Sequence, residues 1–442
     1  MTIEGSLRKP ERRDIDLTDS TFWDEKDLDK ELRRQFDVCH SCRRCFNLCD
    51  SFPKLFDLID DSETMELDGV NSKSFSGVVD ACTLCDMCFM VSCPYVPPHE
   101  FAIDIPSLFI RYKALDNKNK KFFDNELAKT DRNGKLGIIL PSFFNFIIKK
   151  KNKFFRKILS FIVGIDISAT LPKFNKNSFK NFFKKYQEKF KHKKNYAEKV
   201  IIFTSCYVNY NDSKIGEALV KVLEKNNIYM EEYYSGCCKM PQLEQGKVNE
   251  VQSQAIETAN ALSKKIDKGF KVVVPVASCA LMLKSHWPLL NPSNDEVKKL
   301  SAATMDIDEY IWELNSSIGL VDGMKTLNKK ITLHSSCHSR AQNIGPKSAQ
   351  ILNLIPNTVA VNVEKCSGHG GTWGVKKKWN KTARKVGLNA AKQVFKDKDV
   401  IIASTCPLAG LHLKDINESK NISNYDDKIY HPIELIAKSY GL

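Results

Sequence analysis

The sequence of 442 residues lacks three features that would each have indicated a particular class of protein. Its longest apolar stretches, Leu136 to Ile148 and Phe154 to Ile165, are interrupted by charge, proline or glycine and fall short of the ~20 apolar residues that span a bilayer. It has no glycine fingerprint of a flavin-binding or dinucleotide-binding loop. Met1 to Lys30 is polar and charged, so we expect no secretory leader and a cytoplasmic location.

Acidic residues are scarce in one segment only. The formal net charge is +14, and between Lys135 and Lys199 sixteen lysines and one arginine stand against three acidic residues. That segment therefore contains the whole basic excess, while basic and acidic residues balance in the rest of the chain. Because no base-reading module accompanies the charge, we expect no nucleic-acid partner.

Cysteine, in contrast, is abundant. The chain has fifteen cysteines, an odd number, and most of them stand at spacings typical of metal ligands. In a chain without an expected leader, this usage indicates a reducing compartment and metal–sulfur chemistry in preference to disulfides.

Two cysteine-rich runs near the N-terminus are the strongest motif in the sequence. Each run has three cysteines at intervals of three residues and a fourth further on, a pattern typical of two-cluster bacterial ferredoxins. In that pattern the fourth cysteine of each run ligates the cluster of the other run. The spacing therefore predicts two [4Fe–4S] clusters, one held by Cys39, Cys42, Cys45 and Cys93, the other by Cys82, Cys85, Cys88 and Cys49.

A pair of zinc knuckles is the alternative, but zinc sites need only paired cysteines and leave the third and fourth of each run unexplained. The 32 residues between Cys49 and Cys82 exceed what a compact β-type ferredoxin needs. We therefore predict a mobile N-terminus over residues 1–20 and a helical ferredoxin domain over residues 21–115.

Residues 116–197 are predicted to form a linker, over 116–134, followed by a basic amphipathic segment. Lysines such as Lys149, Lys153 and Lys157 alternate there with bulky apolar residues such as Phe154 and Phe161. Such a helix suits the surface of an anionic bilayer, with its apolar face down. A helical hairpin packed on the protein, with a solvated lysine face, fits the same pattern, and the sequence leaves both open.

The remainder of the chain is an internal repeat of about 130 residues, over 198–325 and 326–442. Strand-like runs alternate with helical patterns in both copies, which predicts two α/β units with parallel strands. In each copy the cysteines follow strand ends, where α/β folds place their sites. The matching positions are Cys206 and Cys337, Cys237 and Cys366, and Cys279 and Cys406.

These repeats resemble the CCG (cysteine-rich) domains of heterodisulfide reductase catalytic subunits. The resemblance rests on Gly236-Cys237-Cys238, on Ser278-Cys279 and on the stretch from Cys366 to Gly374. A two-cluster ferredoxin followed by tandem CCG domains is also similar to the iron–sulfur subunits of anaerobic glycerol-3-phosphate dehydrogenase and of glycolate oxidase. The resemblance implies membrane-associated electron transfer from a flavoprotein dehydrogenase partner toward quinone or another acceptor.

The repeats depart from the five-cysteine CCG pattern. The last position is Met282 in the first copy and Ala409 in the second, and Ser367 replaces the doubled cysteine of the second copy. The first copy keeps four thiols, enough for a third iron–sulfur cluster or for zinc. The second keeps three, so a metal there needs a further ligand, for which His338 and His369 are candidates, or an open iron. Otherwise its cysteines are vestigial. The candidate metal ligands are Cys206, Cys237, Cys238, Cys279, Cys337, Cys366 and Cys406.

Together these patterns predict an α+β multidomain protein, with a helical two-cluster ferredoxin followed by two α/β CCG repeats. The predicted function is that of an iron–sulfur electron-transfer subunit of an oxidoreductase complex, peripheral on the inner face of a membrane. Two alternatives are disulfide-reductase-like catalysis at the repeat cysteines and a zinc-stabilised interaction module. No catalytic residue is assigned, and whether the chain is itself an enzyme stays open.

Overall fold

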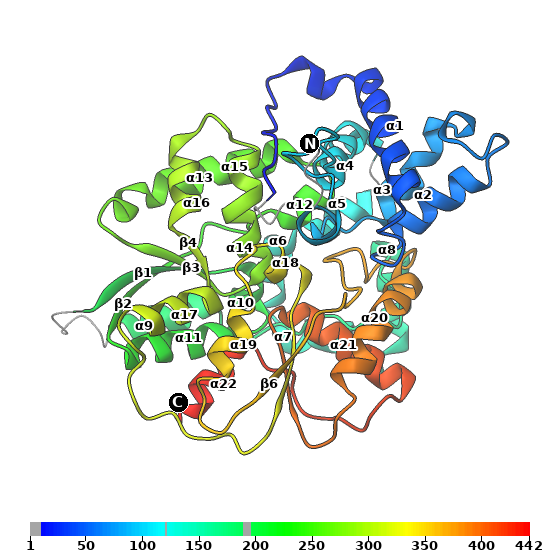
Figure 1. Cartoon of the computed structure of the whole chain (residues 1–442). Coiled ribbons are helices and arrows are strands. Elements are labelled where there is room, and N and C mark those ends of the chain that lie inside the picture. The colour runs from blue at the N-terminus through cyan, green and yellow to red at the C-terminus, as the bar shows by residue number, and fades with distance from the viewer. Residues whose placement is uncertain (1–9, 120–121, 189–195) are drawn as a thin grey trace.

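The computed structural model of the protein describes residues 10–119, 122–188 and 196–442. Figure 1 shows a helical N-terminal part, coloured blue, beside two α/β units, of which the first is green and the second runs from yellow to red. The fold is α/β with two small parallel sheets, which confirms the predicted pair of α/β repeats.

The N-terminal part is helical, as predicted. Asp24 caps the first helix by accepting hydrogen bonds from backbone N–H groups of its first turn. Phe36 lies at the centre of the module, with its ring edge-on to Phe75 at 5.1 Å and to Phe109 at 6.0 Å. The α-helices are α1 Glu25–Cys42, α2 Ser51–Asp60, α3 Phe75–Ala81 and α4 Ile105–Leu115.

Residues 116–119 and 122–137 are more regular than the linker that the sequence predicts. Gly134 packs against the ring of Tyr210 in the first repeat so closely that a Cβ at this position would lie 2.2 Å from the ring. Further along, a backbone bridge between Ile165 and Lys376 ties the basic segment to the second repeat. The predicted linker therefore consists largely of helices packed on the repeats, and small residues allow the close approach. The helices of both stretches are η5 Asp116–Asn119, α5 Phe122–Ala128, α6 Thr130–Gly137, α7 Pro141–Ile148, α8 Lys153–Val163 and α9 Phe179–Gln187.

The first repeat contains a parallel sheet of four strands in the order β2-β1-β3-β4. The central strand β1 is fully buried from Val200 to Phe203, as expected for a strand covered on both faces. The strands are β1 Glu198–Phe203, β2 Ile228–Tyr233, β3 Lys271–Val274 and β4 Thr304–Asp306. The main helices are α11 Ser213–Lys225, α13 Val248–Ile266, α16 Asp295–Ala303 and α17 Ile307–Ser317.

The second repeat contains a parallel sheet of three strands in the order β6-β5-β7. Its central strand β5 pairs with both neighbours over its whole length, as β1 does with β2 in the first copy. The strands are β5 Ile331–His334, β6 Ala360–Val363 and β7 Ile401–Ser404. The main helices are α19 Lys347–Leu352, α20 Asn380–Val394, α21 Pro407–Lys420 and α22 Pro432–Ser439.

In both repeats a serine and a cysteine follow the central strand. Ser205 and Ser336 cap short helices, and Cys206 and Cys337 are the first residues of those helices, α10 Cys206–Tyr210 and α18 Cys337–Arg340. β1 and β5 end three residues before these cysteines, so the cysteines follow the strand ends, as the sequence predicts.

Candidate metal centres

The structure brings Cys39, Cys42, Cys45 and Cys93 together; we call them the first cysteine group. They line one small cavity, at the end of α1 and after the π-helical turn η4 Cys88–Ser92. Burial, followed by the neighbouring thiols of the group, raises the pKa of Cys39 well above its ordinary value. The same causes raise the pKa of Cys45 to about 12.

Cys49, Cys82, Cys85 and Cys88 form the second cysteine group. Burial and the thiols of Cys82 and Cys85 raise the pKa of Cys49. The pKa of Cys88 is raised by burial and by all three other thiols of the group. Leu84 and Asp86, with φ of 49° and 61°, turn the backbone around this group. The eight N-terminal cysteines thus lie in the two sets of four that the spacing predicts; their role as cluster ligands stays a prediction.

The seven cysteines of the repeats line one common cavity of about 210 Å³, which we call the repeat cavity. The cavity is also lined by Thr83 and Cys85 of the N-terminal part and by Thr130 of α6. Among the residues with described placement, no three His, Cys, Asp or Glu side chains are grouped as for a single metal ion.

The four thiols of the first repeat are hydrogen-bonded to one another. The sulfur atoms of Cys206 and Cys237 are 3.9 Å apart, and Thr130 donates to Cys237 over 3.3 Å. Hydrogen bonds from Cys206 and Cys238 lower the pKa of Cys237 well below its ordinary value. A hydrogen bond to Cys237, followed by one with Cys279, raises the pKa of Cys238. No sequence signal points to Thr130, because it lies in the stretch predicted as a linker.

The thiols of the second repeat meet the second cysteine group. Contacts with Cys366 and then Cys85 raise the pKa of the Cys337 thiol, whereas the hydrogen bond from Cys337 lowers the pKa of Cys366 to about 7. Cys406 is buried at the N-cap of α21, where burial, with a smaller contribution from the Cys279 thiol of the first copy, raises its pKa. Sequence reasoning assigns Cys85 to a cluster only and does not place it beside the repeats.

A glycine-rich loop, residues 366–374, closes one side of the repeat cavity. Gly370 has φ of 53°, and a Cβ there would lie 2.6 Å from the side chain of Thr83. Gly371 has φ of 56°, and its Cβ would lie 2.3 Å from a carboxylate oxygen of Glu244 in the first repeat. These positions therefore require glycine because the loop is wedged between the N-terminal part and the first repeat.

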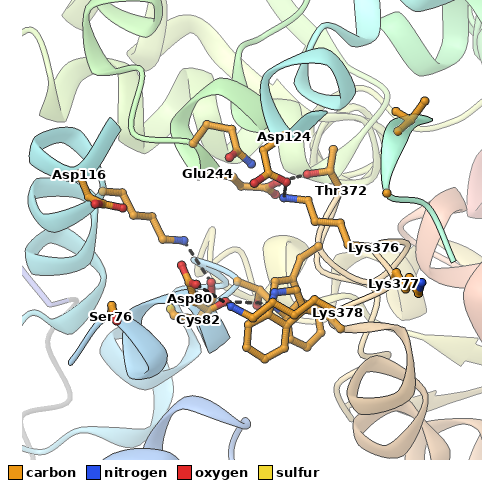
Figure 2. Close-up of a pocket in the computed structure, with 17 residues that line it drawn as sticks. Ser76, Asp80, Cys82, Asp116, Asp124, Glu244, Thr372, Lys376, Lys377 and Lys378 are labelled. Atoms are coloured by element: carbon orange, nitrogen blue, oxygen red, sulfur yellow. Dashed lines mark hydrogen bonds and ion pairs between the residues drawn. The ribbon is translucent and has the colours of Figure 1, made fainter. Parts of the chain in front are cut away.

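A second, larger pocket of about 670 Å³ adjoins the repeat cavity, and Thr83 and Glu244 line both. Figure 2 shows Asp124, Glu244, Thr372 and Lys376 on one side of this pocket and Asp80, Cys82 and Lys378 on another. Lys376 is paired with Asp124 at 2.7 Å and Lys378 with Asp80 at 2.9 Å. Burial raises the pKa of Glu244 to about 7.

Both repeats match a known protein family. The family described as "CCG: Cysteine-rich domain" matches residues 200–284 and 331–414. The chain contains two CCG domains. This confirms the resemblance inferred from the sequence, and the two matched ranges contain the two sheets' cysteine-bearing ends and all seven cysteines of the repeat cavity.

Three curated relatives of this chain are named as subunits of redox enzymes. The C subunit of anaerobic glycerol-3-phosphate dehydrogenase from Escherichia coli K12 is 25% identical over 289 residues, which are 64% of this chain and 69% of the relative. The B subunit of fumarate reductase (CoM/CoB) from Methanothermobacter marburgensis is 27% identical over 56% of this chain and 48% of its own length. The D subunit of dihydromethanophenazine:CoB–CoM heterodisulfide reductase from Methanosarcina barkeri is 29% identical over 55% and 59%.

These matches support an iron–sulfur protein of electron transfer that works with a redox partner. Within the described residues, no helix is long and apolar enough to cross a bilayer.

Proposed function

We propose that this chain is the iron–sulfur electron-transfer subunit of a redox complex, with one [4Fe–4S] cluster in each cysteine group. It would relay electrons between a flavoprotein dehydrogenase partner and quinone or another acceptor. The position of Cys85 is the observation that carries the proposal. Cys85 belongs to the second cysteine group and also lines the repeat cavity against Cys337, so no layer of protein separates the two sites.

The donor sets fit such clusters. Each group offers four thiols, and burial together with mutual repulsion raises the pKa of Cys39 in the first group and of Cys49 in the second, because both disfavour the thiolate. Iron supplies the positive charge that these enclosed thiolates lack. When bound, a [4Fe–4S] cluster takes up and releases one electron at a time.

Backbone N–H groups and one lysine side chain lie next to the cysteines of the two groups. The N–H groups of Leu84 and Tyr95 donate to the sulfur atoms of Cys82 and Cys93, each over 3.4 Å. The ammonium group of Lys113 lies beside the second group, 3.2 Å from the carbonyl oxygen of Cys82. Both kinds of contact stabilise negative charge on sulfur and so favour the reduced state.

The repeat cavity is proposed to hold a further iron–sulfur centre, because the cysteines of both repeats face it. Disulfide-reductase-like catalysis is the second candidate function, and the enclosed cavity with its coupled thiols is the observation that favours it. A zinc-stabilised interaction module is the weaker alternative.

Metal analysis of anaerobically purified full-length protein tests the proposal. We expect at least about eight iron atoms and as many acid-labile sulfides per chain, since the two cysteine groups alone account for that number. Zinc in place of iron would contradict the electron-transfer function and leave the interaction module.

We also propose that α7 and α8 attach the protein to the inner face of an anionic membrane. The sequence leaves open whether this segment lies on a membrane or packs on the protein. In the structure α8 packs on the protein through Arg156, its one fully buried residue, while Phe161 is 88% exposed. An apolar face turned outward beside exposed lysines is complementary to a negatively charged bilayer surface. The exposed apolar residues of the segment are Leu136, Ile139, Leu140, Phe143, Phe146, Phe154, Ile158, Phe161, Ile162 and Ile167.

Co-sedimentation with vesicles checks this attachment. At low salt the protein should bind vesicles containing phosphatidylglycerol, and the double change Phe154→Asp and Phe161→Asp should lower partition about tenfold or more, because two aromatic rings lose their apolar environment. Val359→Asp is the matched control, since Val359 is 60% exposed on the second repeat. Failure of the unchanged protein to bind would rule out the membrane and leave a protein partner for this surface.

A further inference from the structure

The second repeat is one donor short of a four-ligand centre. It contributes Cys337, Cys366 and Cys406 to the repeat cavity, and the positions that complete the family pattern are Ser367 and Ala409. Iron accepts imidazole as well as thiolate. A histidine whose ring nitrogen is not engaged elsewhere is therefore the donor to look for around this cavity.

Two of the nearby histidines are already engaged. His334 contacts the hydroxyl of Ser404 through one ring nitrogen and the carbonyl oxygen of Lys365 through the other, both at 3.0 Å. His338 lines the cavity, but its Nδ1 lies 2.8 Å from the hydroxyl of Ser278. Both rings are thus held by partners from the protein.

His369 lines the cavity without such a partner. Its Nε2 is enclosed by protein and unpaired, and among the described residues none hydrogen-bonds either nitrogen of its ring. Because Nε2 has no exposed surface, Nδ1 is the nitrogen left to face the cavity. The backbone on both sides is fixed, since Gly368 and Gly370 have φ of 72° and 53° and Gly374 donates to the carbonyl oxygen of His369 over 3.0 Å.

A second histidine stands behind His369. The ring centroid of His412 is 5.9 Å from that of His369, and its Nε2 is likewise enclosed and unpaired. The other nitrogen of His412 hydrogen-bonds the backbone at Ala383, which leaves Nε2 as an acceptor directed away from that bond. No hydrogen bond joins the two Nε2 atoms, so within the described part of the chain the ring of His369 is not held by a partner on this side either.

We propose that His369 is the fourth protein ligand of a centre held by Cys337, Cys366 and Cys406. The inference rests on the proposed function, namely on an iron–sulfur centre in the repeat cavity. It assigns the ligating atom as Nδ1.

The test is pulsed electron paramagnetic resonance of the anaerobically purified full chain with ¹⁵N-labelled histidine. We expect a ¹⁵N hyperfine coupling on the centre of the repeat cavity that disappears in His369→Gln and persists in His338→Gln, the matched control from the same cavity wall. Unchanged signals of the two N-terminal clusters would show that both histidine variants are folded.

The results distinguish the role of His369 from the presence of an iron–sulfur centre in the repeat cavity. Iron above about eight atoms with no nitrogen coupling in the unchanged protein overturns the role of His369 and leaves the centre in place. Coupling that survives in His369→Gln overturns it as well. Only about eight iron atoms per chain would remove the centre itself, and the inference with it.

Discussion

Replacing Cys82 by alanine should remove one iron–sulfur cluster and leave the other in place. Cys82 is one of the four thiols of the second cysteine group, and burial raises its pKa to about 11, so its replacement leaves that group one ligand short. We expect a loss of about four iron atoms per chain and of one of two reduced-cluster signals in electron paramagnetic resonance. Chemical iron analysis and spectroscopy of the same sample provide the measurement.

Cys39→Ala is the matched experiment, because Cys39 has the equivalent place in the first cysteine group. It should remove the other signal and spare the one lost in Cys82→Ala. If both variants lost the same signal, or if both kept two, the assignment of ligands to the two groups would be wrong.

Replacing Arg156 by leucine should destabilise the segment around α8 by about 1–3 kcal/mol, since it leaves the buried carbonyl acceptor of Ala169 unpaired. The guanidinium group is fully buried and donates to four backbone carbonyls. The four acceptors belong to Ile148, Asp166, Ile167 and Ala169. Hydrogen exchange of residues 148–169 measures the effect directly.

Arg132→Leu is the control for this change. Arg132 lies in α6, its side chain is 47% exposed, and it pairs with Glu126 at the surface, where such a pair contributes about 0–1 kcal/mol. Similar exchange rates in the two variants would mean that Arg156 does not anchor α8. Vesicle binding by Arg156→Leu should also fall, because the exposed apolar face is then no longer fixed.

The sequence predicts those parts of the fold that depend on local pattern. The helical character of residues 21–115 agrees with the structure, and the strand-like runs of the repeats correspond to β1 to β3 and β5 to β7. β4, with the three residues Thr304–Asp306, was missed because so short a strand has no periodicity and is defined by its pairing with β3.

In the candidate site, too, the sequence predicts contacts between residues that are close in the chain but not contacts between distant ones. Cysteine spacing predicts which thiols group together near the N-terminus, because the ligands are close in sequence. The contact between Cys85 and Cys337, and that of Thr130 with Cys237, join residues more than one hundred positions apart. For α8, periodicity indicates two faces but does not indicate that Arg156 is inside and Phe161 outside, since only tertiary packing decides that.

The common cavity of the two repeats bears on how copies of a duplicated domain diverge. Cys406 of the second copy and Cys279 of the first line the same cavity and interact electrostatically, and Cys85 comes from outside both copies. A substitution of a cysteine in one copy therefore changes the set of sulfur donors that both copies share, and not the site of that copy alone. Because the donors are shared, neither repeat has to preserve a full cysteine motif of its own. The site depends on the two repeats and the N-terminal part together, so these three parts are expected to be inherited as one unit.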